Sequence, residues 1–201
     1  QGEPAGGARH DRRHRRGVVR DYAAQGDLNS LAAYLGEDGP VTGPTRVVCC
    51  GHPILNMLLS NFVERARAEG IRFTAYADVP DMLPFEGPDL FALCANLLEN
   101  AIEAASPLPK EKRWIDAGIR QVSGTVTITV DNAFDGSIHE RSGELLSRKR
   151  LGQPGIGTAS VRRITQSYGG TVAFHWESTD QGGAFHAAVL LPLGKGGKED
   201  A

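Results

Sequence analysis

Residues 89–105 form a strongly apolar segment with the period of an α-helix, and four polar side chains interrupt it. The four recur at intervals of three and four residues, so we expect them to share one side of the helix. They are Asn96, Glu99, Asn100 and Glu103. Amides and carboxylates are costly to bury unless a ligand or an ion satisfies them. A solvent-exposed stripe on an amphipathic helix is the alternative, and this segment alone does not exclude it.

The rest of the chain alternates between helical and strand patterns. Pro53 suits the first turn of a helix that Gly70 ends, and Ser123-Gly124 joins two strands as a hairpin. We therefore expect an α+β fold: a two-layer α/β sandwich with helices covering a mixed, mostly antiparallel sheet, preceded by a helical hairpin. The expected strands are 46–50, 71–77, 114–122, 125–130, 171–176 and 184–191, and the expected helices of this fold are 53–70, 89–105 and 156–168.

A linker rich in glycine and proline, residues 36–45, is the candidate domain boundary. It follows two predicted helices, at about 8–25 and 28–35. The predicted parts are therefore a helical region at 1–45, the α+β domain at 46–195 and a disordered tail at 196–201. The chain begins with Gln1, so we expect it to belong to a longer protein.

Composition excludes several classes of function. The net charge of −2 argues against nucleic acid as the main partner. No run is long and apolar enough to span a membrane, so a membrane anchor would lie in an upstream segment outside this sequence. Cys49, Cys50 and Cys94 show neither metal-ligand spacing nor an even disulfide set, which favours a reducing, cytoplasmic location.

A glycine set precedes the last predicted helix: Gly152, Gly155 and Gly157, followed by Thr158. Glycines ahead of a helix N-terminus let backbone amides approach phosphate oxygens, and the helix dipole favours negative charge there. A flexible turn is the plainer interpretation of such a short motif. Residues 133–155, between this set and the preceding strand, are long for a loop and suggest a functional lid.

A carboxamide lies at the end of the strand that precedes this lid. Val126, Ile128 and Val130 alternate, so Asn132 continues their face just before Gly136. Asp131 would point to the opposite face. A carboxamide at this place can hydrogen-bond the edge of a purine.

Taken in order, these motifs resemble the nucleotide-binding boxes of the Bergerat-fold (GHKL) ATPases, the family of gyrase-type enzymes and histidine kinases. Residues 96–101, Asn-Leu-Leu-Glu-Asn-Ala, resemble the N box, and Gly155-Ile156-Gly157 resembles the second glycine box. The resemblance implies binding of ATP and Mg²⁺, with Asn100 on the metal. It also implies support of the phosphates and metal by Asn96 and Glu99, and a phosphate cradle around Gly155 and Gly157.

The resemblance assigns the adenine contact to Asn132, where the family has an aspartate. Phe134 stands where the family has the first glycine of that box. In the lid, Arg148 and Lys149 could reach the β- or γ-phosphate when it closes.

The N-terminal segment Arg9-His10-Asp11-Arg12-Arg13-His14 resembles the H box of the peptide-sensing (quorum-sensing type) histidine kinases of Gram-positive bacteria. This implies that His10 accepts the phosphoryl group and that Asp11 orients its ring or accepts its proton. Residues 25–28 and 50–56 extend the resemblance, which covers about residues 8–193. Two alternatives remain: a zinc site at His10 and His14, which the surrounding arginines disfavour, and two exposed histidines on a basic helix.

The resemblance implies a sensor histidine kinase of a two-component system. Residues 1–45 would then be the dimerisation and phosphoacceptor region, and residues 46–195 the ATP-binding catalytic domain. A response-regulator receiver domain is the expected partner, and the N-terminal helices allow a homodimer. An ATP-binding module without kinase activity and an anti-sigma-factor-type serine kinase are the alternatives.

Overall fold

The computed structural model describes residues 46–48, 51–137, 140–141, 144–145, 156–179 and 182–194. The chain divides into two units, and all of these residues belong to the second, residues 44–201. The predicted helices at 8–25 and 28–35 and the predicted tail lie outside the described residues. The domain boundary therefore stays a prediction.

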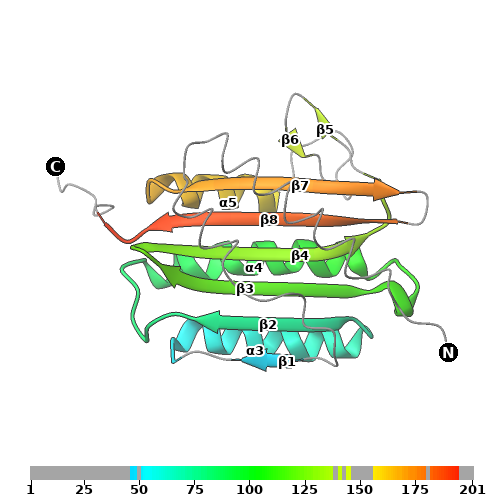
Figure 1. Cartoon of the computed structure of the whole chain (residues 1–201), viewed down its shortest axis with the longest axis horizontal. Helices are drawn as coiled ribbons and strands as arrows, with labels where there is room; N and C mark the ends of the chain where they lie inside the picture. The colour runs from blue at the N-terminus through cyan, green and yellow to red at the C-terminus, as the bar shows by residue number, and fades with distance from the viewer. Residues whose placement is uncertain are drawn as a thin grey trace. The chain divides into compact units, whose positions relative to one another are not determined.

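One layer of the domain is a six-stranded mixed sheet with the order β1-β2-β3-β4-β8-β7 (Figure 1). The pairs β1–β2 and β2–β3 are parallel, whereas β3–β4, β4–β8 and β8–β7 are antiparallel. The predicted mixed, mostly antiparallel sheet is thus confirmed. The strands are β1 (Arg46–Val48), β2 (Arg72–Asp78), β3 (Trp114–Val122), β4 (Thr125–Phe134), β7 (Thr171–Thr179) and β8 (Gly182–Pro192).

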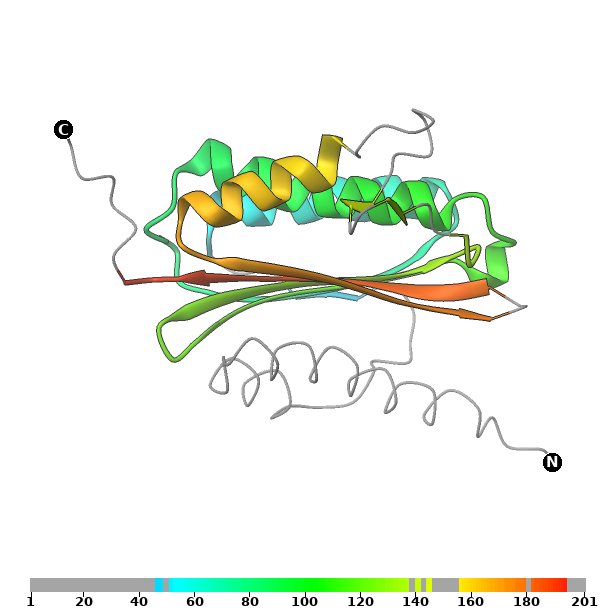
Figure 2. The same ribbon diagram turned by 90° about the horizontal axis from the view of Figure 1, so that it is seen from above.

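The second layer consists of α3 (Pro53–Ala68), α4 (Gly87–Ala105) and α5 (Ile156–Ser167), which lie on one face of the sheet (Figure 2). This arrangement confirms the predicted two-layer sandwich. A short 3-10 helix, η1 (Lys110–Lys112), precedes β3, and β5 (Glu140–Arg141) pairs with β6 (Glu144–Leu145) apart from the main sheet. None of the described helices has the length and apolar character needed to cross a membrane.

Helix α3 has the ends that its sequence predicts. Pro53 occupies the first turn, where a missing backbone N–H costs nothing, and Gly70 adopts a positive φ of 65° just after the helix. The predicted apolar face is buried against the sheet and α4, which confirms it. Its members are Leu55, Leu58, Leu59, Phe62 and Ala66.

Helix α4 is the central helix of the layer. It begins at Gly87, two residues before the predicted start, and Pro88 is accommodated in its first turn. A Cβ on Gly87 would come within 2.7 Å of Ile54 Cδ1, so a glycine lets α3 and α4 approach at this end. The helix buries an apolar stripe: Leu90, Leu93, Cys94, Leu97, Leu98, Ala101, Ile102 and Ala105.

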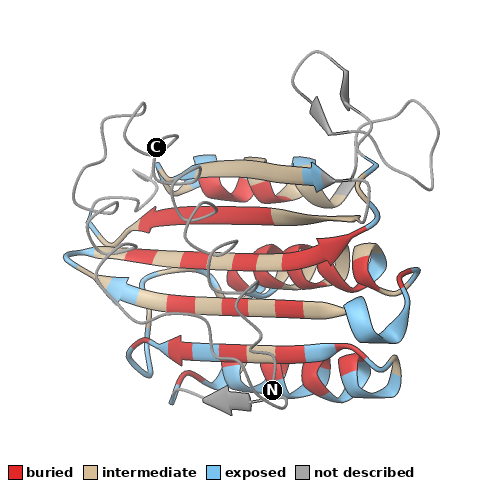
Figure 3. Ribbon diagram, turned by 45° about the vertical axis from the view of Figure 1, so that its right-hand side comes forward, coloured by how far each residue is buried: buried red, intermediate tan, exposed pale blue. Residues whose placement is uncertain are grey.

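Strands β3 and β4 form the predicted hairpin. Ser123 and Gly124 both have positive φ, 48° and 81°, as a tight two-residue turn between strands requires. Buried and partly exposed residues alternate along both strands (Figure 3). Strand β4 continues to Phe134, four residues past the predicted end. The prediction was short because β8 supplies partners that a local pattern does not reveal.

Cys94 makes the stability of the domain dependent on pH. Burial raises the pKa of its thiol to about 12, so the folded state keeps the proton when an unfolded thiol, with a pKa of about 8.5, has lost it. Above about pH 8.5 the unfolded state binds fewer protons, so the free energy of unfolding falls by up to about 1.4 kcal/mol per pH unit until about pH 12. We expect urea unfolding between pH 8 and 10.5 to show this decrease in the free energy of unfolding for the native chain. In Cys94→Ala the part of the decrease that the Cys94 thiol causes should be absent. Equal slopes for the two proteins would contradict the prediction.

Candidate functional site

The two asparagines of α4 lie together on the side of the helix that meets α5. A Cβ added at Gly157, in the first turn of α5, would lie 3.1 Å from both Asn100 amide atoms and 3.2 Å from Asn96 Oδ1. Asn96 Nδ2 donates to the Ala92 carbonyl at 2.6 Å, one turn back. Asn100 of the predicted N box and Gly157 of the predicted glycine box, 57 positions apart in the sequence, are thus neighbours because α4 and α5 pack together.

The start of α5 offers backbone amides beside these carboxamides. The first amides of a helix have no acceptor within the helix, and its dipole makes this end positive. Gly157 is partly exposed and has no side chain, so a ligand can approach its backbone. The arrangement suits an anion that backbone amides bind on one side and that a metal ion, held by a carboxamide oxygen, would bind on the other.

Asn132 faces the helix layer from the sheet and is 2 % exposed. Strand parity predicted this orientation, and the buried alternation of β4 confirms it. The Asn132 amide nitrogen donates to the Ala133 carbonyl at 2.9 Å. Because this bond fixes the nitrogen end of the amide, Oδ1 is presented as an acceptor on the other side.

Asp131 lies on the opposite face of the sheet. Its Oδ1 is 2.7 Å from Nδ1 of His186, the residue directly across the ladder on β8. Asp131 thus belongs to a cross-strand pair away from the helices, as the parity argument predicted. The adenine role assigned to Asn132 stays a prediction.

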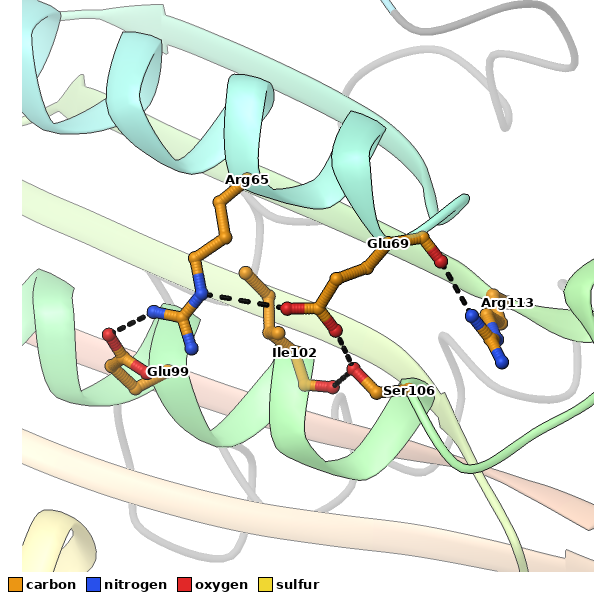
Figure 4. Close-up of polar contacts among 6 residues, drawn as sticks. All are labelled: Arg65, Glu69, Glu99, Ile102, Ser106 and Arg113. Atoms are coloured by element: carbon orange, nitrogen blue, oxygen red, sulfur yellow. Dashed lines mark hydrogen bonds and ion pairs between the residues drawn. The ribbon is translucent and has the colours of Figure 1, made fainter.

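Glu99 separates from the asparagines. Its carboxylate pairs with the Arg65 guanidinium on α3, with about 40 % of each side chain exposed (Figure 4). Successive residues of a helix are 100° apart, so Glu99 turns to α3 while Asn100 turns to α5. The expectation of one shared side was therefore wrong, and the role predicted for Glu99 at the phosphates stays a prediction.

Arg65 is the centre of the polar contacts between α3 and α4. Glu99, followed by Glu69 and Glu103, raises the pKa of Arg65, so its charge is secure. Glu69 also accepts from the Ser106 hydroxyl, and its backbone carbonyl accepts from Arg113 at 2.5 Å (Figure 4). These contacts hold the C-terminal half of α4 against α3 on the side away from Gly157.

Sequence reasoning missed a group of aromatic side chains beside Asn132. Phe185 on β8 lies directly across the ladder from Asn132, and Trp176 on β7 lies directly across from Phe185. Trp176 is thus a sheet-face residue of β7. The alternation of Phe174 and Trp176 was a usable signal, but it did not show which strand would lie beside β4.

The remaining predicted site residues divide between those described and those that are not. Gly136 follows β4 with a positive φ of 86°, and Thr158 lies next to Gly157 in α5. The others lie outside the described residues, so their roles stay predictions: His10, Asp11, Arg148, Lys149, Gly152 and Gly155.

The family model of the GHKL domain matches residues 86–192, from the start of α4 to the end of β8. This chain belongs to the GHKL family. GHKL domains bind ATP, usually together with Mg²⁺. A comparison with the curated proteins finds no match.

Solved structures place this GHKL domain among the catalytic domains of histidine kinases by fold. The catalytic domain of histidine kinase ThkA is 21 % identical, with a TM-score of 0.51 over 70 % of this chain and 91 % of that one. Full-length ShkA in complex with AMPPNP is 17 % identical, with a TM-score of 0.50 over 88 % of this chain and 37 % of that one. At these identities the likeness establishes the fold alone.

The described residues of the GHKL domain fit a nucleotide. A Cβ at Gly157 would crowd the Asn96 and Asn100 amides at 3.1–3.2 Å, so a glycine lets these amides lie this close to the start of α5, as a phosphate cradle requires. Within the described ranges, no three His, Cys, Asp or Glu side chains gather into a metal site. The Asn100 carboxamide oxygen is a ligand of the kind that Mg²⁺ takes, and phosphate and water would supply the others.

Proposed function

We propose that this GHKL chain is an ATP-dependent protein-histidine kinase of a two-component system. The observation that carries the proposal is the packing of Gly157 against the amides of Asn96 and Asn100, with Asn132 buried on the sheet below the helix layer. ATP binding follows from the family. Among the activities of that family, a histidine kinase also assigns a role to His10 and Asp11, as the phosphoacceptor and its neighbour. The AMPPNP complex of ShkA, a protein of the same fold, supports a nucleotide as the ligand.

Each residue of the site has a defined task in this proposal. Asn100 holds Mg²⁺ and Asn96 supports it, while the amides at the start of α5 bind phosphate oxygens. Asn132 Oδ1 accepts a hydrogen bond from the exocyclic amine of adenine. Guanine carries a carbonyl at that position, so an oxygen acceptor discriminates against it. When bound, Mg²⁺ offsets the negative charge of the phosphates.

The transfer itself is a displacement at the γ-phosphorus. A neutral ring nitrogen of His10 forms the new N–P bond as the bond to the β–γ bridging oxygen breaks, and ADP leaves. The proton released from the ring goes to Asp11 or to water. The phosphohistidine then donates its phosphoryl group to a response-regulator aspartate. The proposed kinase is of the peptide-sensing type, and an upstream segment would anchor it to the cytoplasmic side of a membrane.

The experiment incubates the chain with Mg-ATP labelled at the γ-phosphate and compares it with His10→Gln. His14→Gln, one helical turn away by sequence, is the matched control. We expect acid-labile, base-stable label in the native chain and in His14→Gln, and none in His10→Gln. Asn100→Ala should also lose the label, although its acceptor is intact.

Two other outcomes would replace the proposal. Bound ATP without any label would favour a nucleotide-binding module that acts as a phosphotransfer scaffold or a partner-binding switch. Acid-stable label on a separate protein would favour a serine kinase of the anti-sigma-factor type.

A further inference from the structure

The helix-facing side of the sheet carries aromatic rings on the residues around Asn132. Phe134 follows it by two residues on the same face of β4, Phe185 lies directly across on β8, and Trp176 lies across from Phe185 on β7. We call Phe134, Phe185 and Trp176 the aromatic wall. Phe134 is buried, whereas Phe185 and Trp176 keep part of their surface exposed.

The rings of the wall meet at defined angles. Phe134 and Phe185 meet edge to face, with centroids 6.4 Å apart and an interplanar angle of 80°. Trp176 lies parallel to Phe185, with centroids 6.3 Å apart and an angle of 5°. Asn132 therefore has one ring beyond it along its own strand and a second, perpendicular ring beside it on the next strand.

A glycine allows this corner to form. A Cβ at Gly183, directly across from Phe134, would approach Phe134 Cε1 to 2.5 Å and overlap the Glu177 carbonyl. The Phe134 ring thus occupies the space over Gly183 and leans toward Phe185, the next residue but one on β8. The aromatic group continues along β7, where Phe174 stacks on Phe185 with centroids 6.0 Å apart and Arg162 lies over Phe174 at 5.2 Å.

We propose that Phe185 is the stacking surface for the adenine base and that Trp176 is a positioning residue that holds the Phe185 ring. A base whose amine meets Asn132 Oδ1 comes next to the two rings that flank this amide. Of these two rings Phe185 is partly exposed, whereas Phe134 is only 3 % exposed, so Phe185 is the ring that a base can contact. This inference rests on the proposed binding of ATP.

Stacking on an aromatic ring changes the affinity for a base by about 10-fold to 100-fold. Phe185→Leu is therefore expected to weaken ATP binding by about that factor while leaving the affinity for inorganic tripolyphosphate, which has no base, unchanged. Phe62→Leu is the matched control, because Phe62 lies on α3, which packs against β2 and α4. It should bind both ligands as the native chain does.

The positioning role of Trp176 has its own readout. Trp176→Ala should weaken ATP binding and spare tripolyphosphate, and Trp176→Phe should restore the affinity because it keeps a flat ring beside Phe185. The chain has two tryptophans, so Trp114→Phe leaves Trp176 as the only one. In that background, ATP should change the tryptophan fluorescence and tripolyphosphate should not.

Calorimetry on the full chain distinguishes a failure of the stacking inference from a failure of the proposed function. If native protein binds ATP and Phe185→Leu binds it equally well, or loses tripolyphosphate in parallel, the stacking inference is wrong. If the native chain binds neither ligand, the proposed function fails and the inference fails with it. Should Phe185→Leu not fold, Phe185→Met and the fluorescence of Trp176 in the Trp114→Phe background decide the question. An unchanged Trp176 fluorescence on saturation with ATP would overturn the proposal.

Discussion

Gly157→Val is expected to lower the affinity for Mg-ATP by about 100-fold while the domain stays folded. Even a Cβ at this position lies 3.1 Å from the Asn100 amide, closer than ordinary contact distance. The neighbours are the ends of flexible side chains, so the fold can yield by moving them. Movement of these amides displaces the group that would hold the metal, so we expect the loss in binding rather than in stability. Nucleotide calorimetry together with urea unfolding measures both.

Gly194→Val is the control for this substitution. No atom lies within 4 Å of a Cβ at residue 194, and this glycine has no positive φ. Its affinity for Mg-ATP should equal that of the native chain, and Gly157→Ala should fall between the two. Native affinity in Gly157→Val would show that the start of α5 does not form the phosphate site.

Phe73→Ala is expected to destabilise the domain by about 3–5 kcal/mol. Phe73 is fully buried on β2 and belongs to the hydrophobic core between the sheet and the helices. Since domains of this kind are stable by only about 5–15 kcal/mol, the substitution removes a large part of the total. The urea midpoint should fall accordingly.

Phe91→Ala is the matched control for Phe73→Ala. Phe91 lies on α4 and is 41 % exposed, so its truncation should cost less than about 1 kcal/mol. Similar losses for the two phenylalanines would mean that the helix layer does not cover β2 as described.

Local elements of the fold were predictable from the chain. The ends of α3 follow from Pro53 and Gly70, and the β3–β4 hairpin follows from Ser123-Gly124. The orientation of Asn132 followed from the alternation of β4 alone. These features depend on backbone preferences and on a period within one element, so a short stretch of sequence contains what is needed to predict them.

The composition of the candidate site was only partly predictable. Spacing placed Asn96 and Asn100 on one side of α4, but it also placed Glu99 with them. The partner that draws Glu99 away, Arg65, is 34 residues earlier in the chain. Likewise, nothing local indicated that β8 would lie between β4 and β7 and bring Phe185 next to Asn132.

The sequence by itself thus determined the elements, their buried faces and the order of the nucleotide-binding motifs. Only the tertiary structure decided that Gly157 would meet the asparagines of α4, that Glu99 would pair with α3 and that aromatic rings would flank Asn132. The physical reason is that a period specifies which way a side chain points from its own element. Which group it then meets depends on how the helices pack and in what order the strands pair.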